Sequence, residues 1–482
     1  MHKPNKISLL YGFCGLFIAL NIALIIQGFY WFTALPVAII IGYLFFFSLD
    51  KLLFLLIIIT PFTVKYENAA MGFTVNMPAE PIIAAILMLF FLKLIYEQRY
   101  ERAILKHPVT IAIAVYLFWM LITSVTSEMK LVSLKYFISQ LWYIVTFYFV
   151  FIKLFKEKIN LHRFLWYYGV PLAIVILIIT FQHSVYGFDR QVGTWIVRPF
   201  FNDHTNYSAV ISLLTPLFFI FIFNRNYSSL QRFFAILIFM AFTTGIIFSY
   251  SRASWLGIIV SVAAFILIYF RINYRFIAAT ALLVFGLFYT FQTDIIIKLE
   301  RDQQESSGDF REHIQSIYNI TTDASNLERI NRWKSAIRMF EERPVFGWGP
   351  GTYQFVYAPF QRWEDYTPIT THFGDVGNAH SEYIGPLAES GLPGMLTFIA
   401  IVITVLYTGI RNFYKIHDGN LRWLSLGATL GLITYFAHGF LNNFLNTDKA
   451  SVLFWGLIAL IVAIDVFHRK AEAAKKLQSK DQ

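Results

Sequence analysis

The sequence predicts an all-α polytopic membrane protein with about 12–14 transmembrane helices. Of its 482 residues, 57% are hydrophobic and 18% aromatic, and only 14% are charged. The mean hydropathy is +0.57. A soluble protein of this length does not need so much apolar surface. The apolar residues also gather in runs long enough to cross a bilayer, which is the pattern of a chain with many spans.

The expected spans follow one another closely except at one place. They lie at 8–28, 31–49, 51–64, 80–96, 109–126, 134–152, 164–182, 206–223, 231–249, 253–270, 274–291, 392–410, 423–441 and 450–467. The third run is short. If the second and third runs form one broken or re-entrant unit, the number of spans is twelve or thirteen. We therefore expect an N-terminal transmembrane bundle at 1–291, a large outer loop at 292–391, and C-terminal helices with a basic cytoplasmic tail at 392–482.

The first run follows a short basic segment and has no small-residue cleavage site, so we expect a retained span rather than a removed signal peptide. It contains Cys14, the single cysteine of the chain, which excludes an intrachain disulfide.

Lys and Arg determine the expected orientation. With the N-terminus in the cytoplasm, the basic clusters at 93–106, 153–163 and 469–476 all fall inside, and the outer segments carry an excess of Asp and Glu. The net charge of +10 is therefore mainly a topology signal. We expect a lipid bilayer as partner and no nucleic acid.

Four polar elements share the outer face in this orientation. They are the loop 183–205, the turn SYSRAS at 249–254, the large loop, and the turn LNNFLNTDKA at 441–450. Because they lie on one side of the membrane, elements distant in sequence are expected to meet in one site there.

Arg252 in SYSRAS is a candidate anion ligand. Its guanidinium carries a permanent charge and a fork of donors suited to phosphate, and Ser249, Ser251 and Ser254 add hydroxyl groups. The alternative is an arginine that anchors the helix at the membrane boundary. Anchoring arginines are expected on the cytoplasmic side, so an outer arginine in a tight turn favours the functional interpretation.

Arg198 begins a second polar element, RPFFNDHTNYSA. The structural interpretation is a helix cap, with Thr205 or Asn206 at the N-cap position. That interpretation leaves a second role open for Arg198.

The large loop contains an amphipathic helix that starts near Ser325, where Ser325 and Glu328 have the spacing of a capping box. At 100° per residue, Arg329 lands at the edge of the apolar stripe and Arg332 lies further toward the polar face. We expect this helix to lie on the membrane with Arg329 at headgroup level. The stripe comprises Leu327, Ile330, Trp333, Ile337 and Phe340.

His380 follows the residues Gly377 and Asn378, which are suited to start a helix, so we expect it in a first helical turn. The positive end of the helix dipole would keep the imidazole neutral, as a general base requires. Glu382 and Glu389 are nearby carboxylates that would orient the ring or balance its charge. The alternative is a capping or hydrogen-bonded surface histidine.

Gly391 is expected to close this helix, with Pro393 opening the next span. The sequence contains no zinc-ligand spacing, Walker loop, GxSxG elbow or GxGxxG fingerprint. We expect neither a metal ion nor a cofactor.

The order of four motifs is more informative than any one of them. They are Arg-x-x-Phe-x-x-x-x-Asn from Arg198, Ser-Arg-Ala at 251–253, Arg-x-x-x-Trp at 329–333 with Pro-x-x-Gly-x-Gly at 344–349, and His-Ser-Glu-Tyr at 380–383 with Glu-x-Gly-Leu-Pro-Gly at 389–394. This series, over roughly 190–410, resembles the O-antigen ligase and polymerase family. It departs at 202–206, where many relatives have Asn-Pro-Asn.

The resemblance implies a C-type (GT-C) glycosyltransferase of the bacterial inner membrane with its active site on the periplasmic side. Its donor would be a glycan on an undecaprenyl-pyrophosphate carrier. The catalytic base would be His380, and the pyrophosphate would be held by Arg252, Arg329 and, as a further candidate, Arg198. The supporting residues would be Ser251, Trp333, Asn378, Glu382 and Glu389.

Three acceptors fit the same donor chemistry. Lipid A–core would make the protein an O-antigen ligase, a second lipid-linked repeat an O-antigen polymerase, and Ser or Thr of a secreted protein an O-oligosaccharyltransferase. A lipid-linked glycan transporter is the alternative of another class. It predicts ionisable residues near the middle of the spans, whereas the spans here are nearly free of charge and the polar residues gather at the outer face.

Overall fold

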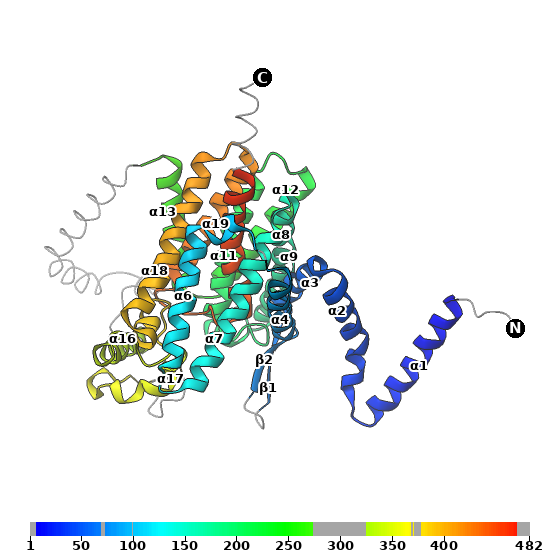
Figure 1. The fold of residues 1–482 in the computed structure, drawn as a ribbon, viewed down its shortest axis with the longest axis horizontal. Helices are drawn as coiled ribbons and strands as arrows, with labels where there is room; N and C mark the ends of the chain where they lie inside the picture. The colour runs from blue at the N-terminus through cyan, green and yellow to red at the C-terminus, as the bar shows by residue number, and fades with distance from the viewer. Residues whose placement is uncertain are drawn as a thin grey trace, which may run out of the picture. The chain divides into compact units, whose positions relative to one another are not determined.

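The computed structural model describes residues 6–68, 73–98, 100–272, 324–367, 370 and 377–469. Most of these residues are helical, so the predicted all-α class is confirmed (Figure 1). The chain divides into two units, Met1–Ile57 and Ile58–Gln482, which are described separately.

The first unit is a pair of apolar helices, α1 (Lys6–Ile26) and α2 (Leu35–Phe47), joined by the short helix η1 (Tyr30–Ala34) and followed by the start of α3 (Leu49–Ile59). The connection is held by Thr33, whose hydroxyl donates to Asn21 Oδ1 at 3.1 Å. No described residue of α2 is buried. An apolar helix whose described side chains are not buried is the expected form of a lipid-facing segment.

The second unit contains the other helices. They are η2 (Thr60–Phe62), α4 (Ala79–Glu97), α5 (Arg102–Leu105), α6 (Pro108–Val125), α7 (Lys130–Ile144), the π-helical turn η3 (Val145–Val150), α8 (Phe151–Leu154), α9 (Lys158–Val185), α10 (Arg190–Trp195), α11 (His204–Ile222), α12 (Ser229–Phe248), α13 (Arg252–Tyr269), α16 (Ala324–Glu342), α17 (Tyr353–Val356), η5 (Ala358–Phe360), η6 (Trp363–Asp365), α18 (Ile384–Lys415), α19 (Gly419–His438), α20 (Asp448–Ala463) and the π-helical turn η7 (Ile464–Arg469).

Nine helices of the described residues are long and apolar enough to cross a membrane, which makes the protein polytopic. They match expected runs between 80 and 467. Two shorter apolar stretches are Tyr11–Ile26 within α1 and Phe32–Phe47 across η1 and α2. Helix α19 has 20 residues and is outside the nine. The expected run 274–291 lies outside the described residues, as does much of the expected loop 292–391, so the span count and the domain boundaries stay predictions.

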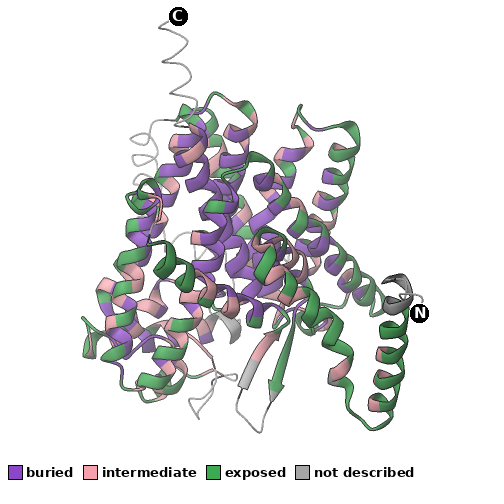
Figure 2. Ribbon diagram, turned by 45° about the vertical axis from the view of Figure 1, so that its right-hand side comes forward, coloured by how far each residue is buried: buried purple, intermediate pink, exposed green. Residues whose placement is uncertain are grey.

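Helix α20 forms the centre of the second unit, because every residue from Asp448 to Ala463 is buried (Figure 2). Beside it, α11 and α19 approach closely at Gly431, where a Cβ would meet the carbonyl oxygen of Leu213 at 2.1 Å. Helix α13 is close to α19 in the same way, since a Cβ on Gly257 would lie 2.7 Å from Thr434 O. Small residues therefore bring together the helices whose ends carry the candidate site.

One element was not predicted. Strands β1 (Val64–Asn68) and β2 (Phe73–Met77) form an antiparallel hairpin in which Val64 pairs with Met77. The hairpin projects from the same end of the second unit as α17 (Figure 1). It adds polar side chains to the surroundings of the candidate site.

The predicted break at Gly391 is confirmed. α18 is interrupted there, because Gly391 has φ 68° and ψ −173°. A side chain is excluded by space as well as by backbone conformation, since a Cβ would lie 2.1 Å from Val345 O. The Leu392 N–H donates to Pro344 O at 2.9 Å, so the break is tied to the turn that follows α16.

Candidate functional site at one end of the helical bundle

Loops that are far apart in sequence meet at one end of the second unit. Ser127 donates to Trp348 O at 3.2 Å, and Glu382 N donates to Gly439 O at 2.7 Å. The 441–447 turn joins them, because Phe444 N donates to the Glu382 carboxylate at 2.8 Å. The structure thus brings together segments that the sequence assigned to one face.

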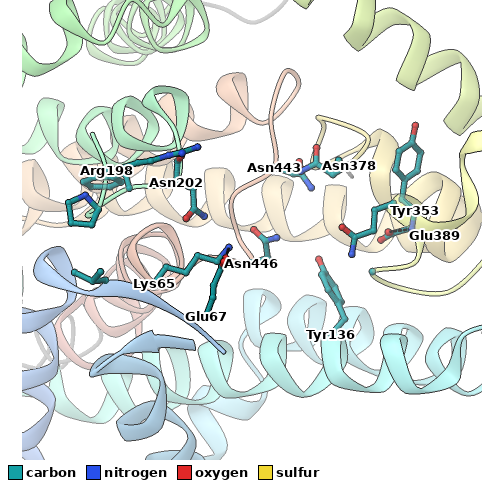
Figure 3. Close-up of a pocket in the computed structure, with 16 residues that line it drawn as sticks. Lys65, Glu67, Tyr136, Arg198, Asn202, Tyr353, Asn378, Glu389, Asn443 and Asn446 are labelled. Carbon is teal, nitrogen blue, oxygen red and sulfur yellow. Dashed lines mark hydrogen bonds and ion pairs between the residues drawn. The ribbon is translucent and has the colours of Figure 1, made fainter. Parts of the chain in front are cut away.

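A cavity of about 820 Å³ opens among these loops (Figure 3). Its wall is rich in amide, phenol and charged groups, which suits a ligand with many hydroxyl groups. His380, Arg252 and Arg329 do not line it, although Asn378 does. The lining residues are Val64, Lys65, Glu67, Tyr136, Arg198, Pro199, Phe201, Asn202, Gly351, Tyr353, Gln354, Gly377, Asn378, Glu389, Asn443 and Asn446.

Arg198 lies where this cavity meets a second hollow of about 560 Å³. The second hollow is mainly apolar and is formed by Gln182, Val185, Tyr186, Trp195 and Ile196 together with Arg198. The side chain of Arg198 is exposed, and its Nε donates to Asn202 O at 3.4 Å. A cation at such a junction is placed for an anionic group that joins a polar part to an apolar part.

The N-cap of α11 is Asp203, so the prediction of Thr205 or Asn206 was wrong. The Asp203 carboxylate accepts from the backbone N–H groups of both residues at 2.8 Å. Asp203 has the extended backbone of an N-cap residue, with φ −153° and ψ 165°. Its charge is close enough to act on the ring of His380.

His380 precedes α18 rather than occupying its first turn, so that part of the prediction was wrong. The helix begins at Ile384, and Ser381 Oγ accepts from the N–H groups of Tyr383 and Ile384, each at 3.2 Å. His380 itself has a left-handed φ of 47°. Its N–H donates to Asn378 Oδ1 at 2.9 Å, so Asn378 holds the turn that carries the imidazole.

The imidazole of His380 is kept neutral by its surroundings rather than by a helix dipole. Burial lowers its pKa most, and the charges of Arg332 and Arg329 lower it further, against the opposing effects of Asp203 and Glu328. The resulting pKa is about 4. The expected neutral ring is therefore present, with a different cause.

Arg332 is a buried framework residue, so its expected place toward the polar face of the helix was wrong. Its Nε lies 2.8 Å from Glu328 Oε1, and both residues are 5% exposed. Hydrogen bonds from Thr367 and Thr370 and the charge of Arg332 outweigh burial and lower the pKa of Glu328. Gly377 beside this pair has a φ of 106°, which favours glycine, and a Cβ there would lie 1.9 Å from Arg332 Nη1.

Arg329 lies one turn earlier on α16 and is half-buried. Its charge acts on the rings of His380 and His438, which places the three groups near one another. Trp333 is also half-buried, and its buried indole nitrogen makes no hydrogen bond to the described residues. The predicted stripe from Leu327 to Phe340 is largely half-buried or exposed, while the face bearing Arg332, Ala336 and Met339 packs inward.

Arg252 is the first residue of α13 and is half-buried. Its position follows from the packing of α13 on α19. Gly257 lies against Thr434, and Ser261, four residues later in the chain, donates to Leu430 O at 3.0 Å. The same antiparallel register puts the start of α13 level with His438. Arg252 is therefore at the same end of the bundle as Arg329.

The serines of SYSRAS are used within the protein. The buried Ser254 hydroxyl donates to Ser208 Oγ at 2.7 Å and approaches Ser251 Oγ at 3.4 Å. Ser249 donates to Ile246 O at 2.7 Å. Their placement favours a structural role at the helix junction over the expected direct contribution to an anion site.

Glu382 and Glu389 hold neighbouring loops. The Glu382 carboxylate accepts from Tyr435 Oη at 2.7 Å and from two N–H groups of the 441–447 turn. Burial raises the pKa of Glu382 despite these hydrogen bonds. Glu389 accepts from Tyr353 N at 3.0 Å. Among the described residues, neither carboxylate is hydrogen-bonded to the imidazole of His380.

His438 was not among the predicted residues. It is 1% exposed at the end of α19, and neither ring nitrogen has a hydrogen-bond partner among the described residues. Buried oxygen or nitrogen atoms of Asn206, Asn442 and Asn443 share this condition. Buried polar atoms are normally paired, so each of these atoms is open to a ligand or to water. The signal in the sequence was a histidine at the polar end of an apolar run.

The described residues contain no group of three or more His, Cys, Asp or Glu side chains that could hold a metal ion. The charged side chains that act on His380 are instead two arginines, Arg329 and Arg332, and two separate carboxylates, Asp203 and Glu328. With the neutral imidazole of His380, this end of the bundle offers donors for an anion and a group that can accept a proton.

Comparison with known proteins supports the resemblance seen in the motifs. Residues 235–399 match the family described as O-antigen ligase, and this match includes Arg252, Arg329 and His380 but not Arg198. The chain is also similar to a Haemophilus influenzae protein described as an uncharacterized protein. The two are 20% identical over 299 residues, which cover 61% of this chain and 72% of that protein.

Proposed function

Residues 235–399 match the O-antigen ligase family, and from this premise we propose a specific reaction for the chain. A glycan is transferred from an undecaprenyl-pyrophosphate carrier to a hydroxyl group of lipid A–core. The reaction takes place at the periplasmic face of the bacterial inner membrane, within a GT-C-like fold.

One observation carries the proposal: His380 is a half-buried, neutral imidazole close to the charge of Arg329, at an end of the bundle that also holds Arg252 and a polar cavity. A neutral imidazole is able to accept a proton. Arginines stabilise a phosphate leaving group as its charge develops. The proposed reaction needs both groups at one membrane surface.

In the proposed step, His380 removes the proton from the acceptor hydroxyl while the acceptor oxygen attacks the anomeric carbon of the donor sugar. The bond between that carbon and the pyrophosphate oxygen breaks, and both of its electrons leave with the pyrophosphate. The proton remains on His380 until it is released to water. General-base assistance of this kind contributes about 10²–10⁴-fold to the rate.

Arg252 and Arg329 bind the pyrophosphate in this scheme. Arg198 has a further role where the polar cavity meets the apolar hollow, since the donor has a glycan on one side of its pyrophosphate and a lipid on the other. Asn378 orients the turn of His380. Ser251, Trp333, Glu382 and Glu389 support the surrounding helices and loops.

Binding of the donor also adjusts the base. In the free protein, the charges of Arg329 and Arg332 help to lower the pKa of His380 to about 4, which makes it a weak base. A bound pyrophosphate opposes those charges, so the imidazole becomes more basic when the donor is present. Proton transfer is thereby linked to a filled donor site.

The test is transfer by the purified protein from a lipid-linked glycan to separate acceptors. We expect a product with lipid A–core that disappears when lipid A–core is omitted. Product on a second lipid-linked repeat would identify a polymerase, and product on a secreted protein an O-oligosaccharyltransferase. Movement of the donor across vesicles without any glycosyl transfer would instead identify a transporter and refute the proposal.

A further inference from the structure

A separate cavity, of about 330 Å³, lies at the opposite end of the helices from the candidate site. Asp448 begins α20 at the site end, and Asp465 lies 17 residues later beside this separate cavity. At 1.5 Å per helical residue these positions are about 26 Å apart. The cavity lining comprises Arg102, Ala103, Lys106, His107, Pro108, Arg411, Asp465 and Arg469.

The carboxylate of Asp465 is already fully engaged in this cavity. Its Oδ1 lies 2.6 Å from Arg469 Nε, and its Oδ2 lies 2.8 Å from Arg411 Nη2. His107 Nδ1 accepts from Val109 N at 3.2 Å, so a neutral ring carries its proton on Nε2, which lies 3.4 Å from Asp465 Oδ2. These contacts join the ends of α6, α18 and α20.

A positive charge excess remains after these contacts are counted. The lining holds the fixed cations Arg102, Lys106, Arg411 and Arg469 but one carboxylate. Within the described part of the chain, Arg102 and Lys106 have no carboxylate within 4.0 Å. The nearby Glu101 is paired with Lys156 at 3.4 Å, and the buried Nε of Arg411 has no hydrogen-bond partner among the described residues.

We propose that this cavity binds a phosphate-bearing anion. Guanidinium groups present paired donors to phosphate oxygens, and Lys106 adds a point charge. The Lys and Arg distribution assigns this end of the helices to the cytoplasm. Basic pockets between helices at that surface suit the headgroups of anionic phospholipids, and a free phosphate compound has the same chemistry.

The test measures the thermal unfolding midpoint of the purified full-length protein in neutral detergent at constant ionic strength. It is titrated separately with short-chain phosphatidylglycerol, phosphatidylethanolamine and inorganic phosphate. The variant is Arg102→Gln with Lys106→Gln, because both side chains are exposed and outside the Asp465 contacts. The matched control is Arg225→Gln with Lys415→Gln, which removes two exposed cations from the same end without touching the cavity.

We expect a saturable rise of the midpoint with phosphatidylglycerol or with inorganic phosphate. The variant should require about 10–30-fold more ligand, and the control should behave as the wild type. A response to phosphatidylglycerol alone identifies a lipid headgroup, and an equal response to inorganic phosphate identifies a soluble anion. No saturable response to either anion, an unchanged variant, or equal losses in variant and control would overturn the proposal.

Discussion

The polar groups that frame the candidate site and those inside it are buried to similar extents, but only the first are paired. In the frame, Glu328 and Arg332 are each 5% exposed and contact each other at 2.8 Å. Inside, His438 is 1% and Asn206 3% exposed, yet both have polar atoms without a partner among the described residues. An unsatisfied buried group costs about 1–3 kcal/mol. The paired frame therefore serves stability, whereas the polar atoms of the proposed interior are left open to a ligand or to water.

The largest expected effect separates catalysis from the frame. His380→Gln keeps a hydrogen-bonding side chain that does not accept a proton near neutral pH. Transfer from purified lipid-linked donor to acceptor should fall about 10²–10⁴-fold, with thermal unfolding little changed. His417→Gln, an exposed histidine at the other end, is the matched control. Near-normal turnover by the His380 variant would leave this residue with only a positioning role.

The next prediction concerns the ion pair of Glu328 and Arg332 in the frame. Glu328→Ala leaves the buried charge of Arg332 without its carboxylate, so the free energy of unfolding should fall by about 3–5 kcal/mol. The double variant Glu328→Ala with Arg332→Met removes both charges and should recover much of that loss. Thermal unfolding in detergent measures both. If the single variant is as stable as the wild type, the pair does not hold the frame.

The arginines of the interior should respond in the opposite way. Arg252→Lys and Arg329→Lys keep the charge but remove the guanidinium fork. Each should reduce transfer about 10²–10³-fold without lowering the unfolding midpoint. Normal transfer by both variants at normal protein levels would exclude the proposed contact with pyrophosphate.

A smaller effect tests the unpaired interior directly. His438→Phe replaces a buried imidazole by an apolar ring next to Phe444, whose ring centroid lies 5.9 Å away. Since the imidazole is unsatisfied, the variant should be as stable as the wild type or up to about 1–3 kcal/mol more stable. Its transfer activity should fall. A clear loss of stability in thermal unfolding would instead assign His438 to the frame.

The pH dependence should sharpen the comparison further. Protonation of His380 removes the base, so activity falls as pH decreases through its pKa. With a pKa of about 4 in the free protein, kcat/KM should persist to near pH 4. The acid limb of kcat should lie at higher pH, because bound pyrophosphate raises that pKa. Coincident limbs for the two parameters would contradict the link between donor binding and His380.

The membrane helices and the break at Gly391 were predictable because long apolar runs and glycine have strong local causes. The buried framework role of Arg332 was not predictable from the sequence. Helical spacing placed Arg332 toward the polar face, but its guanidinium is buried by contacts with Glu328 and Asn378, which are formed only in the folded chain. Local patterns do not report such tertiary pairs.

His438 and Asp203 were missed for related reasons. His438 gains its significance from Arg329, which lies over a hundred residues away in the chain, and Asp203 was one of several residues able to cap α11. The β1–β2 hairpin is too short to stand out beside apolar runs. The sequence thus identified His380, Arg252 and Arg329 as candidates but not the partners that surround them.

The break at Gly391 has a mechanical consequence. The first seven residues of α18 are fastened to the turn after α16, since Trp348 N donates to Ala388 O at 3.2 Å and Gly349 N to Glu389 O at 2.7 Å. The long remainder of α18 starts beyond the non-helical Gly391, and its first residue, Leu392, donates to Pro344 O of the same turn. Because the same turn holds both sides of the break, the segment that follows His380 and the membrane-spanning remainder of α18 take different directions while their junction stays fixed.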